Sequence, residues 1–164
     1  MKLPFRRSVL LVCVALAIPA VTATAATKTA RFNVTATVDS DCTISASNLA
    51  FGNMGLLAEN LDAVATITVT CTPTTPYAIS LDEGDVPGSS VDARMMASGS
   101  SSMLFQIYRD AARTQVWGKT SGVDTVGGTG NGNAAELTLY GRIPAQAPPT
   151  VGSYIAQITA TITY

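Results

Sequence analysis

The sequence has 164 residues, with ten Lys and Arg against eleven Asp and Glu, and it contains no histidine. A net charge of −1 argues against nucleic-acid binding, which requires clustered basic residues. The lack of histidine excludes Ser-His-Asp and Cys-His catalysis and removes the commonest transition-metal ligand. Only 13% of the residues are charged, which suits a subunit that packs against others.

The first 25 residues have the organisation of a secretory signal peptide. Lys2, Arg6 and Arg7 form a basic start, residues 8–18 are small or apolar, and Ala23-Thr24-Ala25 resembles a cleavage site. The apolar run is shorter than the roughly 20 residues that a membrane span needs. We expect cleavage at residue 25 or 26. The exported chain would then have about 139 residues, seven basic and eleven acidic, and no membrane span.

Two cysteines remain after this cleavage, Cys42 and Cys71. In an exported protein an even pair is most simply one disulfide. Closing a loop of about 30 residues contributes roughly 3–4 kcal/mol in the chain-entropy model. A redox or metal site is the weaker alternative, because the sequence has neither histidine nor a C-x-x-C spacing.

The exported chain begins with a segment of alternating character, residues 26–38, that follows a short polar leader. Its apolar positions alternate with Asn and Thr, which predicts a β-strand. These positions are Phe32, Val34, Ala36 and Val38. Residues 39–41 interrupt the strand, and an extended segment resumes at Cys42.

Five further segments are expected to form strands because they alternate or are rich in β-branched and aromatic residues. They are residues 63–71, 77–81, 94–96, 103–108 and 136–143.

Between these strands, residues 49–55 are expected to be irregular, 73–76 a turn, 82–90 a loop and 127–133 a flexible exposed loop.

Two features between the strands have alternative interpretations. Asp82, Glu83 and Asp85 do not fit a calcium-binding loop, so a solvated acidic turn is the favoured interpretation. Trp117, the single tryptophan, is expected to be a core residue and not a ligand platform.

The last segment, residues 154–164, also has a period of two. One face is formed by Tyr154, Ala156, Ile158, Ala160, Ile162 and Tyr164. The other face is mainly threonine, which is typical of a half-buried strand. The strand reaches the last residue of the sequence, and an uncovered apolar edge is a hazard. We expect another polypeptide to cover this edge; pairing with an earlier strand of the same chain is the alternative.

Short strands, turn residues and no helical period predict an all-β fold, an immunoglobulin-like β-sandwich in a single domain over residues 39–164. No pattern of catalytic residues, metal ligands or cofactor-binding residues is recognisable, so we expect a protein that is not an enzyme.

A set of short motifs occurs in a characteristic order along the chain. They are Cys42-Thr43-Ile44, Leu49-Ala50-Phe51-Gly52, residues 67–72, residues 77–84, Arg94-Met95-Met96, residues 104–108, Trp117-Gly118, residues 140–144, Gly152-Ser153-Tyr154 and residues 161–164. Together they resemble the spore coat protein U domain, the subunit family of archaic (Csu-type) chaperone–usher pili. The resemblance spans essentially the whole exported chain.

This resemblance implies an incomplete immunoglobulin-like sandwich, completed by a donor strand from another chain. The implied partners are a periplasmic pilus chaperone, an outer-membrane usher and other copies of the chain or related subunits. The donor residues would be Phe32, Val34, Ala36 and Val38, within a donor segment at 26–38 that overlaps the first expected strand. The segment 154–164 would form one wall of the acceptor groove, and Cys42 and Cys71 would form the disulfide.

The implied function is a structural subunit of a secreted surface fibre that passes through the periplasm and supports adhesion and biofilm formation. Two alternatives remain: a structural protein of a spore or cyst coat, and a self-contained secreted binding module whose own N-terminal strand fills the groove.

Overall fold

The computed structural model describes residues 22–164. The predicted signal peptide therefore lies largely outside the described residues. Contacts within the chain divide it into two units, Met1–Ala36 and Thr37–Tyr164. Residues 22–41 are exposed and have no regular secondary structure, and all strands of the described chain belong to the second unit.

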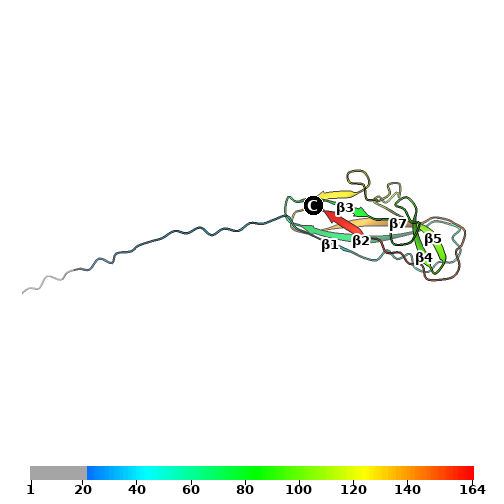
Figure 1. Ribbon diagram of the computed structural model, residues 1–164, viewed down its shortest axis with the longest axis horizontal. Coiled ribbons are helices and arrows are strands. Elements are labelled where there is room, and N and C mark those ends of the chain that lie inside the picture. The colour runs from blue at the N-terminus through cyan, green and yellow to red at the C-terminus, as the bar shows by residue number, and fades with distance from the viewer. Residues whose placement is uncertain (1–21) are drawn as a thin grey trace, which may run out of the picture. The chain divides into compact units, whose positions relative to one another are not determined.

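The described chain contains eight strands and no helix. Figure 1 shows how these strands are arranged. They are β1 (Cys42–Ala46), β2 (Leu61–Cys71), β3 (Pro76–Leu81), β4 (Arg94–Ser98), β5 (Ser101–Tyr108), β6 (Val126–Thr129), β7 (Ala134–Ile143) and β8 (Ala160–Thr163). This confirms the all-β prediction.

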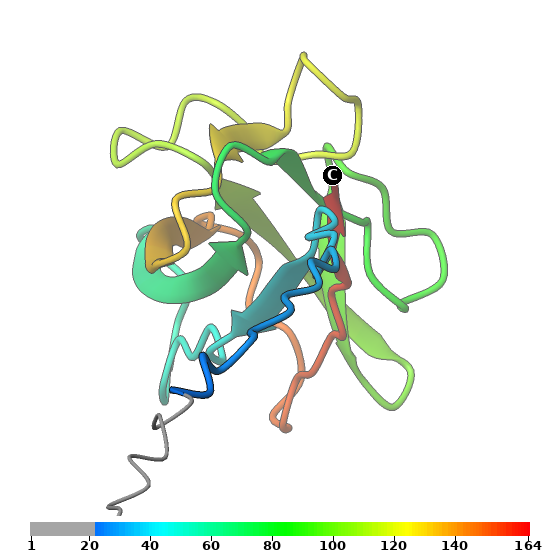
Figure 2. The same ribbon diagram turned by 90° about the vertical axis from the view of Figure 1, so that its left-hand side faces the viewer.

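The strands form two antiparallel sheets, a five-stranded one in the order β1-β2-β7-β5-β4 and a three-stranded one in the order β6-β3-β8. The longest ladder joins β2 to β7, from the pair Leu61↔Ile143 to the pair Thr70↔Ala134. The connection from β7 to β8 leaves the larger sheet and enters the smaller one, seen as the orange-to-red trace in Figure 2.

A single apolar core is formed by residues of both sheets. Its buried members from the strands are Ala65, Ile67, Val69, Cys71, Ile79, Leu81, Met96, Met103, Phe105, Ile107, Leu139 and Ile143. Along β2 the buried residues occupy every second position from Ala65 to Cys71, because successive side chains of a strand point to opposite faces. Trp117 is 1% exposed and packs in this core, as expected.

The expected strand at residues 32–38 is not formed. Phe32, Val34 and Val38 are between 84% and 86% exposed, and the segment has no ladder partner in the described chain. The sequence period was that of a strand, but a strand is stable only when its backbone hydrogen-bonds to a neighbour.

Two other boundaries differ from expectation. The expected flexible loop at 127–133 contains most of β6, in which Gly127 and Gly128 pair with Ala78 and Tyr77. A side chain at Gly128 would meet the Tyr77 ring at 2.5 Å, so the glycine reflects close packing rather than flexibility. The expected strand at 154–164 is regular only from Ala160 to Thr163.

Candidate functional site

An open groove of about 1420 Å³ runs along the second unit. Its floor is the apolar core, with Ile67, Leu81, Met96, Met103, Phe105, Ile107 and Leu139 among the lining residues. One wall is the stretch from Ile44 to Leu57, and the other is the stretch from Pro148 to Ala160. The groove therefore reaches the apolar core between two extended segments, and its floor residues are at most 8% exposed.

The first wall starts in β1, which is an outer strand of its sheet. One edge of β1 pairs with β2, and no described strand pairs with its other edge. Beyond β1 the chain is irregular, but Leu49 and Phe51 pack against the core. Gly141 of β7 lies beneath them, since a Cβ there would meet Leu49 at 2.6 Å and Phe51 at 2.9 Å.

A disulfide fixes this wall to the larger sheet. The Sγ atoms of Cys42 and Cys71 are 2.01 Å apart, and the two residues are directly opposite in the β1–β2 ladder. The predicted disulfide is confirmed. It attaches the first residue of β1 to the last residue of β2.

The second wall is the C-terminal segment. The two-residue period of its sequence correctly predicted which side chains face the core, except at the last residue. The side chains of Tyr154, Ala156, Ile158, Ala160 and Ile162 are partly buried and pack against the core. The intervening residues are exposed. Tyr164, assigned to the same face, is 54% exposed, and its hydroxyl donates to Asp41 Oδ1 at 3.4 Å.

The backbone of this wall hydrogen-bonds on one side only. Ile155 exchanges two backbone bonds with Ala97 of β4, of 3.0 and 2.9 Å, and the end of the segment pairs with β3. Alternate residues of an extended segment direct N–H and C=O to the same side. The groups of Ala156 and Ile158 therefore point to the opposite side, toward the groove, and have no hydrogen-bond partner among residues 22–164.

Between Ile155 and β8 no described strand pairs with this wall, and two aspartates of the loop after β3 form hydrogen bonds with its backbone instead. The backbone N–H of Thr159 donates to Asp82 Oδ1 at 2.8 Å, and that of Gln157 donates to Asp85 Oδ1 at 2.8 Å. In return, the N–H groups of Asp82 and Asp85 donate to the carbonyls of Thr159 and Gln157 at 3.1 and 3.2 Å. The two aspartates of the expected acidic turn therefore have a further role: Asp85 is exposed and Asp82 partly buried, and both accept hydrogen bonds from the backbone of the wall.

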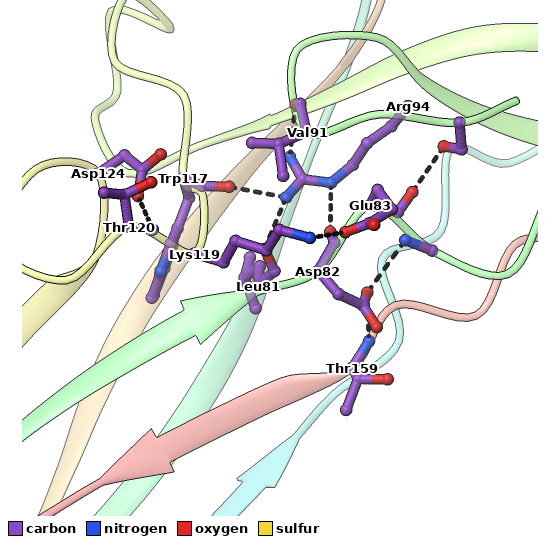
Figure 3. Close-up of polar contacts among 12 residues, drawn as sticks. Leu81, Asp82, Glu83, Val91, Arg94, Trp117, Lys119, Thr120, Asp124 and Thr159 are labelled. Atoms are coloured by element: carbon purple, nitrogen blue, oxygen red, sulfur yellow. Dashed lines mark hydrogen bonds and ion pairs between the residues drawn. The ribbon is translucent and has the colours of Figure 1, made fainter.

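The loop that carries the aspartates is anchored by Arg94, which is fully buried. Its guanidinium donates to the carbonyls of Leu81, Asp82 and Trp117 at 3.1, 2.8 and 2.8 Å, as Figure 3 shows. It also donates to Gln106 Oε1 at 2.7 Å. Burial lowers the pKa of Arg94 to about 10, opposed by the nearby carboxylates of Asp82 and others, so it is charged at neutral pH.

Sequence reasoning did not identify the roles of Arg94, Asp82 and Asp85. A lone arginine at an inward position of an otherwise apolar strand was the available signal for Arg94. For the aspartates no local signal existed, since their partners are 77 and 72 residues away in the chain.

The predicted donor residues are all exposed: Phe32, Val34, Ala36 and Val38. Their role as donors stays a prediction.

Residues 22–164 contain no group of three or more His, Cys, Asp or Glu side chains arranged to hold a metal ion. No helix of that part of the chain has the length and apolar character needed to cross a membrane.

The comparison with solved structures gives a match of the same fold. A chain in the crystal structure of the CsuC–CsuE chaperone–tip adhesion subunit pre-assembly complex, from archaic chaperone–usher Csu pili of Acinetobacter baumannii, matches with a TM-score of 0.59 and 21% identity. The match covers 78% of the present chain but only 40% of that chain. At this identity the likeness concerns the fold.

Sequence comparisons identify the family. Protein U of Myxococcus xanthus is 30% identical over 158 residues, which are 87% of this chain and 88% of the relative. The family model described as Spore Coat Protein U domain matches residues 28–161. The resemblance recognised in the sequence motifs is thus confirmed, and the chain belongs to the Spore Coat Protein U domain family.

Proposed function

We propose that this protein is a structural subunit of a surface fibre, assembled by donor-strand exchange in a chaperone–usher pathway. The observation that carries the proposal is the open groove, whose apolar floor lies between the outer edge of β1 and the unpaired backbone edge at Ala156 and Ile158. An extended peptide inserted there gains main-chain hydrogen bonds from the edges and apolar burial from the floor.

The chain itself contains a segment suited to such a groove. Phe32, Val34, Ala36 and Val38 would face the floor, while Asn33, Thr35 and Thr37 would face outward. Their full exposure in the single chain leaves them available for a second copy. The fold likeness to a chain from a chaperone–subunit complex of Csu pili supports this assignment.

In this pathway a periplasmic chaperone would occupy the groove first, and an outer-membrane usher would then exchange the chaperone strand for the donor segment of the next subunit. The protein would be exported and would end in an extracellular fibre that supports adhesion and biofilm formation.

The experiment compares unboiled and boiled samples of the exported protein on a denaturing gel. For the wild type we expect a ladder of multimers that collapses to one band only on boiling. Deleting residues 26–38, or the substitution Val34→Asp, should abolish the ladder, because a charge cannot be buried on the apolar floor without a partner.

Thr35→Asp is the matched control, since it adds the same charge one residue away on the outward face. The ladder should persist in this variant. A wild-type protein that runs as a monomer without boiling would contradict the proposal and favour a secreted module whose groove is filled by its own chain.

A second candidate, a structural component of a spore or cyst coat, is favoured by the family name and by the relative from Myxococcus xanthus. It would use the same groove, and immunogold labelling of intact cells distinguishes the two. Label on thin fibres supports the pilus, and label on a coat layer supports the second candidate.

A further inference from the structure

Between Ile155 and Ala160, the C-terminal wall of the groove is held on the side away from the groove by a loop and not by a strand. After Leu81 the chain leaves the path of β3, and Gly84 adopts a left-handed φ of +89°. A Cβ at Gly84 would meet Ile158 Cδ1 at 2.8 Å and the Gln157 carbonyl oxygen at 3.2 Å. The loop is therefore packed closely against the wall at the place where the β3–β8 ladder has ended.

Two aspartates of this loop continue the ladder with their side chains. Each forms a reciprocal pair with one wall residue: Asp82 with Thr159 and Asp85 with Gln157. Each aspartate supplies a backbone N–H donor and a carboxylate acceptor. The carboxylate takes the place of the backbone carbonyl that a strand residue would supply. Asp82 Oδ1 also accepts from Gly84 N at 3.0 Å, which fixes the orientation of its carboxylate.

These pairs determine where the unpaired edge of the wall lies. Gln157 and Thr159 alternate with Ala156 and Ile158, whose backbone groups face the groove. Without the two carboxylates, the N–H groups of Gln157 and Thr159 would lack acceptors on the loop side. The wall would then be free to rotate or shift, and its groove-facing edge would no longer keep the orientation that an incoming strand requires.

The loop is itself fixed to the core, so the support is rigid. Arg94 Nε donates to the Asp82 carbonyl at 2.8 Å, and Lys119 pairs with Glu83 at 2.7 Å. Ser89 Oγ donates to the Glu83 carbonyl and accepts from Met95 N. Figure 3 shows the resulting sequence of contacts from Arg94 through Asp82 to Thr159.

We propose that Asp82 and Asp85 are positioning residues for strand capture, which hold the C-terminal wall in register so that its free edge can bind the donor segment of a second copy. This inference rests on the proposed function. It adds two specific residues, on a loop outside the groove lining, that set how fast a strand is captured.

The test measures capture of a fluorescent synthetic peptide of residues 26–38 by the full exported chain carrying Val34→Asp, which prevents self-exchange. Asp85→Ala is the informative variant, because within residues 22–164 the Asp85 carboxylate accepts only from Gln157. We expect capture to be about tenfold slower, the effect of losing one hydrogen bond to a charged acceptor. Urea unfolding, followed by Trp117 fluorescence, should show that the variant is still fully folded under the conditions of the capture assay.

Two further variants separate the hydrogen bond from charge. Asp85→Asn keeps a carbonyl acceptor and should retain near-parental capture. Asp92→Ala removes the same charge from the same loop, where Asp92 has no hydrogen bond in the described chain, and should have no effect. If Asp85→Ala does not fold, Asp85→Glu replaces it: the acceptor is displaced by one methylene, and slower capture is again expected.

Amide hydrogen exchange provides a second readout, with faster exchange expected at Gln157 in Asp85→Ala and unchanged exchange in the core of β2. Parental capture rates in both Asp85→Ala and Asp85→Glu would overturn the positioning role and leave the proposed function intact. If the parent chain captures no peptide at all, the proposed function fails, and the positioning role fails with it.

Discussion

Among single residues, Arg94 has the most extensive set of contacts. Five polar groups from four parts of the chain accept hydrogen bonds from its guanidinium, the farthest being the carbonyl of Trp117. No carboxylate is among these acceptors: the direct hydrogen bonds go to backbone carbonyls and to Gln106, and carboxylates such as Asp82 favour the charge from a longer distance. This arrangement joins the loop that carries Asp82 and Asp85 to the core through one side chain.

Replacing Arg94 by Met should destabilise the fold strongly, because several buried carbonyls lose their donor at once. We expect a loss on the order of 3 kcal/mol or more in the free energy of unfolding, measured by urea titration of Trp117 fluorescence. Lys119→Met is the control: its ion pair with Glu83 is exposed, so its loss should change the free energy of unfolding little. A loss below about 1 kcal/mol for Arg94→Met would contradict this account.

Asp62 is the residue from which a pH dependence follows. Its carboxylate accepts from Arg142 Nε at 2.7 Å and Nη2 at 2.9 Å, and Arg113 Nη1 lies 3.3 Å away. The hydrogen bond from Arg142 lowers the pKa of Asp62 below its ordinary value of 3.8. The ionised form is thus favoured by folding, so its stabilising contribution is complete above that value and is lost as the pH falls through the folded pKa.

We therefore expect Asp62→Asn to be less stable than wild type at pH 7, by about 1 kcal/mol or less because the pair is exposed. The difference should shrink as the pH falls from about 5 to about 2. Urea unfolding of both proteins across this range is the measurement, with Glu136→Gln as a control whose difference from wild type should not follow this pattern. A difference that stays constant with pH would argue against the ion pair.

At the scale of elements, the two-residue period predicted most strands. In the C-terminal wall it also predicted the side chains that pack against the core, with Tyr164 as the exception. The period reports side-chain environment, and it does not reveal what the backbone pairs with. For this reason residues 32–38 were expected to be a strand, although they have no partner in the chain.

The backbone partners of the wall could not be predicted for a related reason. Asp82 and Asp85 lie in a segment whose composition is that of an ordinary polar loop. Their hydrogen bonds to Thr159 and Gln157 arise only when β3 and β8 pair and bring the loop alongside. Such contacts depend on the tertiary fold and leave no pattern in the local sequence.

The attachment of β1 to β2 by the disulfide leads to a prediction for that element. Removing it with the double substitution Cys42→Ser and Cys71→Ser should lower the free energy of unfolding by roughly 3–4 kcal/mol, since the bond closes a loop with a sequence separation of 29. Reduction of the wild type should give a similar loss, measured by urea unfolding with and without reductant. If the reduced and oxidised proteins unfold at the same urea concentration, the disulfide does not stabilise the β1 wall.

For the whole molecule, the open groove leaves apolar surface on both of its walls. Leu81, Met96, Phe105 and Leu139 line the groove but are only 2–8% exposed. An inserted strand would mainly bury the partly exposed wall residues Leu49, Phe51, Tyr154, Ala156 and Ile158. A ligand that binds only the folded state raises stability in proportion to RT ln(1 + [L]/Kd), which is about 2.7 kcal/mol at a concentration of 100 Kd. The free energy of unfolding of this subunit should therefore rise with the concentration of a peptide that can occupy the groove.

The corresponding experiment is a thermal unfolding series of the Val34→Asp exported chain with increasing amounts of the synthetic peptide of residues 26–38. We expect the unfolding midpoint to rise continuously with peptide concentration, by several degrees at about 100 Kd, because an increment of this size is a large fraction of a small domain's stability. A peptide carrying Val34→Asp should give no rise, since its charge would face the apolar floor, and one carrying Thr35→Asp should act as wild type. Equal effects of all three peptides would indicate non-specific association, and the groove would then not be the binding site.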